Sequence, residues 1–204
     1  NVRIVNVKYD DETTAGVNRY FLRKGSMPIY DFRGCPIYPY FYSLISARSD
    51  LVFHADADIL FGGMSQNWIR EAVALLEGDA SLLTVSPHPG PPHPQEILRE
   101  QNKYEPISDI PYAFRFQTFS TRVFFLNREQ LRQRMRFSLP SLPKIAYAVR
   151  HGFPACETAE KAIATFMRRE QVGRVDFLGM GDGMWTLHPQ RRSDAFFEEL
   201  PSII

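Results

Sequence analysis

The sequence predicts an α/β fold built around a mostly parallel β-sheet. Strand-like runs rich in Val, Ile and Phe alternate along the chain with segments whose apolar residues recur at helical spacing. One of these runs, residues 51–57, is apolar up to its end, which is typical of a strand in the interior of a sheet. Alternation of this kind is characteristic of parallel strands joined by helices.

The first elements are short. Residues 2–7 are expected to form a strand. A helix is expected over 15–23, with Thr13 or Thr14 as its N-cap, because a hydroxyl at that position accepts a hydrogen bond from the first turn. Residues 28–32 are expected to form a second short strand.

The next two elements precede the acidic residues. A helix is expected over 38–48, since Pro36 lies just before it and Pro39 lies in its first turn, where proline is tolerated. Residues 51–57 then form the apolar strand, and the glycines at 62–63 turn the chain after it.

A further helix and strand complete the first half. Ser65 caps a helix over 68–76, whose apolar residues share one face, and residues 81–86 form another strand. Residues 87–94 contain five prolines in eight positions, so we expect an extended loop there and neither a helix nor a central strand. Residues 95–109 are polar and are expected at the surface.

The second half repeats the alternation less regularly. The last expected strand is followed by a glycine-rich loop that carries Trp and His. The expected elements are a strand at 116–126, a helix at 127–135, a loop at 140–143, a helix at 157–170, a strand at 174–178 and a loop at 179–192.

Composition indicates a single domain over residues 1–204. The 24 Lys and Arg nearly balance the 23 Asp and Glu, which argues against a nucleic-acid partner, and no apolar run approaches the roughly 20 residues of a membrane helix. No secretory signal precedes the first strand, and two cysteines, Cys35 and Cys156, are too few for a disulfide framework or a thiolate zinc site. We therefore expect a cytoplasmic protein with both thiols reduced and buried.

Asp56 and Asp58 lie at the end of the apolar strand. Side chains two apart on a strand point to the same side, so both carboxylates are expected to face one point, where a cation would relieve their repulsion. Carboxylate oxygens suit Mg²⁺ or Mn²⁺, which often keep water and substrate phosphates as further ligands. His54 shares this face and is expected to support the acids without binding the ion.

These residues resemble a known family. The segment 31–40, the helix after it and the strand ending in Asp56 and Asp58 resemble glycosyltransferases of the GT-A fold, more narrowly the large inverting family with many bacterial polysaccharide-building members. The later block 183–189, with its Trp-x-x-His, strengthens the resemblance. It implies a three-layer GT-A sandwich with residues 1–86 as the nucleotide- and metal-binding half and 87–204 as the acceptor-side half.

The resemblance implies a hexosyltransferase-type enzyme that moves a sugar from a UDP- or GDP-sugar to an unidentified glycan, lipid or small-molecule acceptor. In such enzymes the Asp-x-Asp binds Mn²⁺ or Mg²⁺, which holds the donor diphosphate. This role falls on Asp58, with Asp56 also a ligand or near the ribose, and the late loop adds His188. The remaining nucleotide-binding candidates are Asp10 or Asp11, Asp31, Arg33, Arg191 and Arg192.

An inverting transfer needs a general base for the acceptor hydroxyl. The family usually supplies it from a Glu-Asp pair at the start of a helix, and here Glu160 matches the Glu, whereas Lys161 replaces the Asp. Glu160 is our first candidate and Glu157 the second, although acids in a first helical turn are also favoured by the helix dipole.

Two alternatives remain open. An apolar strand ending in Asp-x-Asp, with a later Gly181-Asp182-Gly183, also occurs in phosphohydrolases with an aspartyl nucleophile, although a second acid is missing after that glycine. The chain also opens at what resembles a later strand of the family, so we expect the first βα unit to be absent. Together with Lys161, this allows a non-catalytic carbohydrate- or nucleotide-binding relative.

Overall fold

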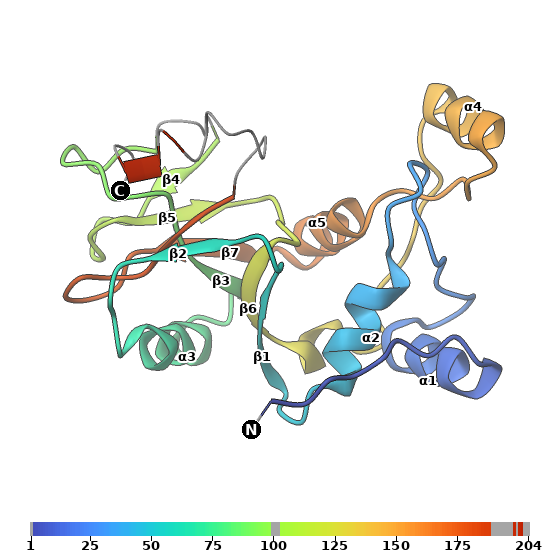
Figure 1. The fold of residues 1–204 in the computed structure, drawn as a ribbon, viewed down its shortest axis with the longest axis horizontal. Coiled ribbons are helices and arrows are strands. Elements are labelled where there is room, and N and C mark those ends of the chain that lie inside the picture. Colours follow the sequence, from blue (N-terminus) through green and yellow to red (C-terminus); the bar gives the residue numbers. More distant parts are fainter. Residues whose placement is uncertain (1, 99–102, 189–197, 199, 202–204) are drawn as a thin grey trace. The chain divides into compact units, whose positions relative to one another are not determined.

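The computed structural model describes residues 2–98, 103–188, 198, 200 and 201 (Figure 1). The chain forms two compact units. Unit 1 comprises Asn1–Val52 and Asn127–Glu170, and unit 2 comprises Phe53–Leu126 and Gln171–Ile204. Both units are therefore discontinuous in sequence, and the chain passes between them inside two strands and at the end of one helix.

Unit 1 is mainly helical. Its described helices are α1 (Asp11–Phe21), α2 (Tyr38–Ser46), the 3₁₀ helix η1 (Arg128–Leu131), α4 (Leu142–His151) and α5 (Ala159–Glu170). Asp10, and not Thr13 or Thr14, caps α1, because its carboxylate accepts the backbone N–H of Thr13 at 2.9 Å. Phe21 of α1 packs edge-to-face on Phe41 of α2 in the interior of the unit, with ring centroids 5.0 Å apart.

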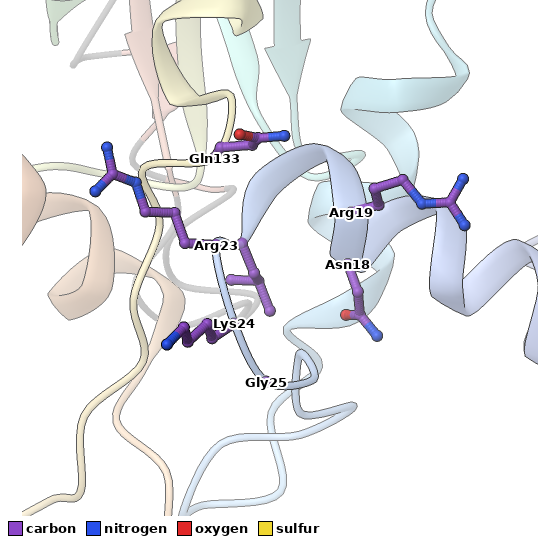
Figure 2. A pocket seen from close by; sticks show the side chains of 7 residues that line it. Asn18, Arg19, Arg23, Lys24, Gly25 and Gln133 are labelled. Atoms are coloured by element: carbon purple, nitrogen blue, oxygen red, sulfur yellow. The ribbon is translucent and has the colours of Figure 1, made fainter.

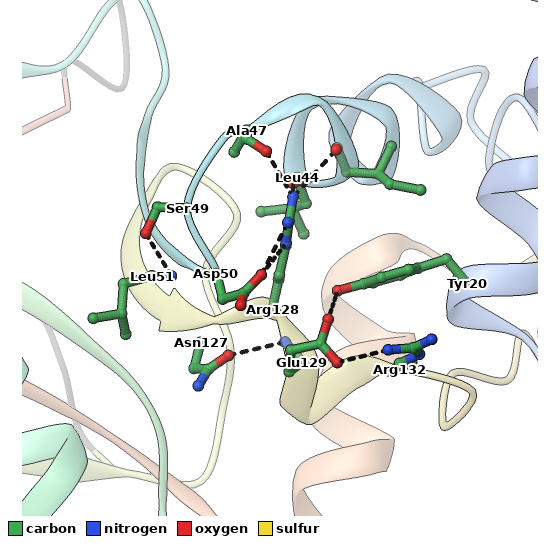
Figure 3. A network of polar contacts seen from close by, with 11 residues as sticks. Tyr20, Leu44, Ala47, Ser49, Asp50, Leu51, Asn127, Arg128, Glu129 and Arg132 are labelled. Carbon is green, nitrogen blue, oxygen red and sulfur yellow. Dashed lines mark hydrogen bonds and ion pairs between the residues drawn. The ribbon is translucent and has the colours of Figure 1, made fainter.

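Arg128 ties the end of α2 to the start of the strand that carries the acidic pair (Figure 3). Its Nη1 donates to the carbonyl oxygens of Leu44, Ile45 and Ala47 at 2.8–3.1 Å, and its Nε and Nη2 donate to the carboxylate of Asp50 at 3.1 and 2.9 Å. The last carbonyls of a helix have no partners within the helix, so a cation at this position stabilises both the helix end and the approach to the strand.

Unit 2 is a sheet with one helix, α3 (Trp68–Gly78), packed on it. Its described strands are β1 (Leu51–Ala55), β2 (Leu60–Gly62), β3 (Leu82–Pro89), β4 (Glu105–Pro106), β5 (Ala113–Phe116), β6 (Val123–Asn127), β7 (Gly173–Phe177) and β8 (Trp185–Leu187). Trp68 of α3 stacks on Phe177 of β7 at 4.9 Å, and its Nε1 donates to the Phe177 carbonyl at 3.1 Å. This contact holds the helix against the carboxyl end of β7.

The sheet is mixed, so the prediction of a mostly parallel sheet is wrong. The strand order is β1-β6-β3-β7-β5-β4, and β8 pairs with both β3 and β2. Strand β3 runs parallel to β7 and β8, whereas β6 is antiparallel to β3, β5 to both β4 and β7, and β2 to β8. The α/β class itself is confirmed. Short connections without a helix, such as residues 107–112 between β4 and β5, permit antiparallel pairing.

Strand β3 runs into the proline-rich segment, which we expected to be a loop. His88 N–H donates to Met184 O at 3.2 Å and Gly90 N–H donates to Thr186 O at 2.8 Å, so the donors at these alternate positions point toward β8. Pro87 and Pro89 therefore face the other side, where β7 ends at Phe177. Because β7 ends at this point, the missing N–H groups of the two prolines remove few hydrogen bonds between β3 and β7, which explains why prolines are tolerated in this strand.

Other element boundaries also differ from the sequence-based expectations. Residues 2–7 and 28–32 are not strands, and in unit 1 the second of these forms only an isolated bridge between Tyr30 and Pro36. Of the expected strand at 116–126, only Phe116 at the end of β5 and residues 123–126 in β6 are in strands, and the expected helix at 127–135 is only the short 3₁₀ helix η1. Helix α4 begins inside the loop expected at 140–143 and continues through residues for which no element was expected; Pro143 lies in its first turn and Gly152 ends it with φ 71°.

Across the described residues, none of the helices combines the length and apolar character needed to cross a bilayer.

Candidate metal and nucleotide site

Asp56 and Asp58 lie just beyond the carboxyl end of β1. Strand β1 ends at Ala55, and Ile59 N–H donates to Asp56 O at 3.2 Å, so the two aspartates lie in the turn between β1 and β2 and not on the strand, where we expected them. Their carboxylates contact different imidazoles. Asp56 Oδ1 lies 3.2 Å from His54 Nε2, and Asp58 Oδ2 lies 3.4 Å from His188 Nε2.

Antiparallel pairing of β2 with β8 brings His188 to Asp58. The register pairs Leu60 with Leu187, so the residue after β8 lies beside the residues that precede β2. His188 and Asp58 are 130 positions apart in the sequence, and the pairing of these two short strands places them in contact. Parallel pairing of β8 with β3 anchors β8 to the centre of the sheet, so His188 projects from a supported strand end.

The glycine pair after the aspartates makes this pairing sterically possible. A Cβ on Gly62 would lie 1.9 Å from the ring of the buried Trp185. Gly63 has φ +77°, and a Cβ there would lie 2.2 Å from the carbonyl oxygen of Gly183. Only glycine permits so close an approach of two backbones at this φ.

Asp58 and His188 are suited in chemistry and spacing to one hard cation. Two ligands at right angles on an ion with bonds of about 2.1 Å lie about 3.0 Å apart, close to the 3.4 Å between these atoms. The side chains of Asp58 and His188 are 26% and 22% exposed, so the pair is open to solvent and to a ligand. His188 Nδ1 is buried and has no hydrogen-bond partner in the described structure.

The described residues contain no group of three or more His, Cys, Asp and Glu side chains arranged to hold a metal ion. A cation at Asp58 and His188 would therefore have two protein ligands and complete its shell with water and phosphate oxygens, as Mg²⁺ sites often do. His54 supports Asp56 from the same face, as their spacing predicts, and its ring stacks on Phe124 at 4.7 Å.

Asp31 and Arg33 lie in a self-contained loop of unit 1. The Asp31 side chain is 2% exposed. It accepts the N–H groups of Arg33 and Cys35 at 2.8 and 3.0 Å and the Arg33 guanidinium at 2.9 and 3.1 Å. The carboxylate thus holds its own loop closed, whereas the Arg33 side chain is 48% exposed.

The two thiols near this loop differ. Cys35 is exposed, which contradicts our expectation, whereas Cys156 is buried as expected. Burial raises the pKa of Cys156 to about 11, with added repulsion from the carboxylates of Asp31 and Glu157.

The other predicted nucleotide residues lie in unit 1 or outside the described residues. Asp10 and Asp11 begin α1 in unit 1, and hydrogen bonds from the backbone N–H and hydroxyl of Thr13 lower the pKa of Asp10. Arg191 and Arg192 lie outside the described residues.

The two candidate bases are both in unit 1 and have different surroundings. Glu157 is buried and its carboxylate oxygens lie 3.0 and 3.3 Å from the ammonium of Lys144, which also lies 4.8 Å from the centre of the Phe32 ring. Glu160 is half-buried in the first turn of α5. Sequence reasoning missed Lys144, because no spacing pattern connects it with a glutamate 13 residues later.

Arg33 is electrostatically linked to one of these acids. Partial desolvation opposes its charge, but the hydrogen bonds to Asp31 and the negative charges of Asp31 and Glu160 outweigh that effect and raise the pKa of Arg33. The loop 31–35 and the start of α5 therefore share an electrostatic environment. Phe32 N–H, which donates to Cys156 O at 2.8 Å, joins them through the backbone.

Comparisons with known proteins identify no relative, since no family model, curated protein or solved structure matches this chain.

Proposed function

We propose that this protein is a metal-dependent glycosyltransferase that transfers a sugar, with inversion, from a UDP- or GDP-sugar to an acceptor that the chain does not identify. The observation that carries the proposal is the contact between Asp58 Oδ2 and His188 Nε2, a carboxylate and an imidazole brought together at strand ends. Ligands of open α/β sheets bind at the carboxyl ends of strands, which is where Asp58 lies.

The leaving group of such a transfer is a nucleoside diphosphate that gains negative charge as the sugar departs. A bound Mn²⁺ or Mg²⁺ supplies Lewis-acid stabilisation of that charge. Asp58 and His188 are the side chains that would hold the cation, and His54 would keep the Asp56 carboxylate oriented beside it. The exposed fractions of Asp58 and His188 leave space for diphosphate oxygens.

Glu160 is the better candidate for the general base. A base must accept the proton of the acceptor hydroxyl, and both carboxylate oxygens of Glu157 already accept hydrogen bonds from the Lys144 ammonium. Glu160 is half-buried at the start of α5 and neighbours Arg33 electrostatically. We also propose that the fold is a GT-A fold, which agrees with an acidic pair directly after a sheet strand.

Calorimetry of nucleotide binding tests this proposal. UDP or GDP should bind in the presence of Mn²⁺ and bind much more weakly in EDTA, and Asp58→Ala should abolish the metal-dependent part. Asp109→Ala is the matched control, because Asp109 is an exposed aspartate of unit 2 in the connection between β4 and β5. Absence of metal-dependent nucleotide binding in the wild type would refute the proposal.

Turnover separates the remaining alternatives. Glu160→Gln should leave Mn²⁺-dependent nucleotide binding intact and remove slow hydrolysis of the donor sugar. Binding without any turnover in the wild type would indicate a non-catalytic nucleotide-binding relative. Release of phosphate from a phosphate monoester, lost in Asp56→Asn and Asp182→Asn, would indicate a phosphohydrolase instead.

A further inference from the structure

Unit 1 has a strongly basic surface where three segments lie side by side. Gln133 N–H donates to Tyr20 O at 2.7 Å and Met135 N–H donates to Phe21 O at 2.9 Å, which joins residues 132–136 to the end of α1. The Arg169 guanidinium at the end of α5 donates to Arg134 O at 3.0 Å. We define the basic surface by the exposed cations of these three segments, which are Arg19, Arg23, Lys24, Arg132, Arg134, Arg136, Arg168 and Arg169.

The acids on this surface are too few to neutralise it. Glu129 pairs with Arg132 at 3.2 Å, and Glu170 lies 2.8 Å from Arg169 and 4.0 Å from Arg134. Within the described residues, Arg19, Arg23 and Lys24 form no ion pair, although the pKa of Glu170 is lowered by the hydrogen bond from Arg169 and, more weakly, by the charge of Arg23. The whole chain has a formal net charge of only +1, so positive charge is concentrated here.

A pocket of about 610 Å³ opens in this surface (Figure 2). Arg19, Arg23 and Lys24 line it together with Asn18 and Gln133, and no carboxylate is among its lining residues. Figure 2 shows Arg23 and Lys24 extending to one side of the loop that contains Gly25, and Arg19 extending to the other side. A ligand seated there would lie beside Arg23 and Lys24, with Arg19 at the opposite side of the loop.

The positive charges of Arg23 and Lys24 are not explained by a need to stabilise the C-terminal end of α1. Cations are favoured near a helix C-terminus, where carbonyl groups lack partners. At the end of α1, however, Leu22 N–H donates to Asn18 O at 2.8 Å, and Tyr20 O and Phe21 O accept from residues 133 and 135. The side chains of Arg23 and Lys24 lie beyond the helix and remain available to an external anion.

We propose that this pocket binds the phosphate or diphosphate group of a ligand. Guanidinium groups bind phosphate oxygens in pairs, and a lysine ammonium adds a point charge. Because the cations are exposed, the affinity should be modest and should fall as salt is added. The site is independent of the Asp58–His188 pair and needs no divalent cation.

Calorimetry with pyrophosphate in EDTA and low salt tests the pocket, because EDTA removes any contribution from a metal site. The double variant Arg23→Gln/Lys24→Gln should weaken pyrophosphate binding by about tenfold or more, as loss of two charge-assisted contacts predicts. The matched control is Lys8→Gln/Arg150→Gln, which removes the same two residue types from exposed positions of unit 1 outside the pocket and should change binding less than about twofold.

A second arm distinguishes a lipid phosphate from a free one. Phosphatidylcholine vesicles with and without phosphatidic acid are sedimented with the wild type and with both double variants. Binding of pyrophosphate or of phosphatidic acid vesicles that is lost in Arg23→Gln/Lys24→Gln supports the pocket, and the arm that binds identifies the source. Failure of both, equal loss in the control, or tighter binding of a single-stranded oligonucleotide than of pyrophosphate overturns the proposal.

Discussion

Asp31 and Asp58 both belong to strand-like stretches of the sequence, yet their carboxylates have opposite surroundings. Asp31 of unit 1 is 2% exposed, and N–H groups within four residues of it saturate its oxygens. Asp58 of unit 2 is 26% exposed and faces an imidazole 130 positions later in the chain. A carboxylate whose oxygens accept hydrogen bonds from its own loop stabilises that loop, whereas a partly exposed carboxylate beside a second potential ligand is available to a cation.

The largest expected effect is on metal-dependent nucleotide binding. Asp58→Ala removes the proposed ligand and should lower Mn²⁺-dependent UDP affinity by at least about 100-fold, since loss of a residue that only supports a ligand already costs about 10–100-fold. His188→Ala should follow the same direction. Asp31→Asn, measured by the same calorimetry on folded protein, should change affinity less than about threefold. Equal losses in Asp31→Asn and Asp58→Ala would remove the distinction between the two sites.

The second effect is on stability, and here we expect a larger loss from replacing Asp31 than from replacing Asp58. Asp31→Ala leaves buried N–H groups and a guanidinium without their acceptor, and it should lower the free energy of unfolding by about 3 kcal/mol. Asp58→Ala without metal should lower it by less than about 1 kcal/mol, because its contact with His188 is partly exposed. Urea unfolding measures both. A larger loss for Asp58 than for Asp31 would contradict this assignment.

The third effect tests how unit 2 brings its two ligands together. Gly62→Ala places a methyl group against the Trp185 ring and should cost about 2 kcal/mol of unfolding free energy. It should also weaken Mn²⁺ binding, because β8 carries His188. Gly78→Ala is the control in the same unit, where an added Cβ meets nothing within 4 Å and the change should be neutral or slightly stabilising. Unchanged metal affinity in a folded Gly62→Ala protein would show that β2–β8 pairing does not position the ligands.

The smallest effect concerns His88, a buried histidine of unit 2. His88 is 1% exposed, its Nδ1 lies 2.7 Å from Gly90 O, and burial lowers its pKa from the usual 6.5 despite that contact. The unfolded chain therefore takes up a proton more readily than the folded one. Stability should be full above about pH 6.5 and should decline as the pH falls below that value.

His88→Gln tests this pH dependence, because the amide can still donate to Gly90 O but does not titrate. Urea unfolding at pH 7, 6 and 5 should show a shallower decline in the variant than in the wild type. A parallel decline in both proteins would assign the acid sensitivity to other groups.

The sequence predicted the class of the fold and the strand that precedes the acidic pair. The apolar run at 51–57 was expected to be a strand, and β1 occupies its first part. The helices at 38–48, 68–76 and 157–170 were found with shifts of a few residues at their ends. These predictions depend on periodicity and capping within a few residues of each position, which local sequence encodes.

Other parts of the fold were not predictable from local pattern. Residues 2–7 have β-type composition, but a strand forms only when a neighbour accepts its hydrogen bonds, and they are not a strand here. Pro87 and Pro89 argued against a central strand, yet β3 contains both because their missing donors face the side where β7 ends. Helix α4 was missed because Pro143 suggested a loop, although proline is favoured in a first helical turn.

The candidate site combines both kinds of information. The carboxylates of Asp56 and Asp58 and the late His188 were chosen from the sequence and its family resemblance, and the structure pairs Asp58 with His188 and Asp56 with His54. The pairing of Lys144 with Glu157 and the basic surface around Arg23 had no signal in the chain, because their members come from separate segments.

Sequence alone thus specified the α/β class, the apolar strand that precedes the acidic pair and the histidine near the end of the chain, because each depends on neighbours within one element. Tertiary structure was needed for the mixed strand order, the register of β2 on β8 and the burial of Asp31 in its own loop. Short strands such as β2 and β8 could pair with several other strands at similar local energy, so their pairing depends on the packing of the whole sheet. The pairing is sterically possible because Gly62 has no side chain to collide with the Trp185 ring.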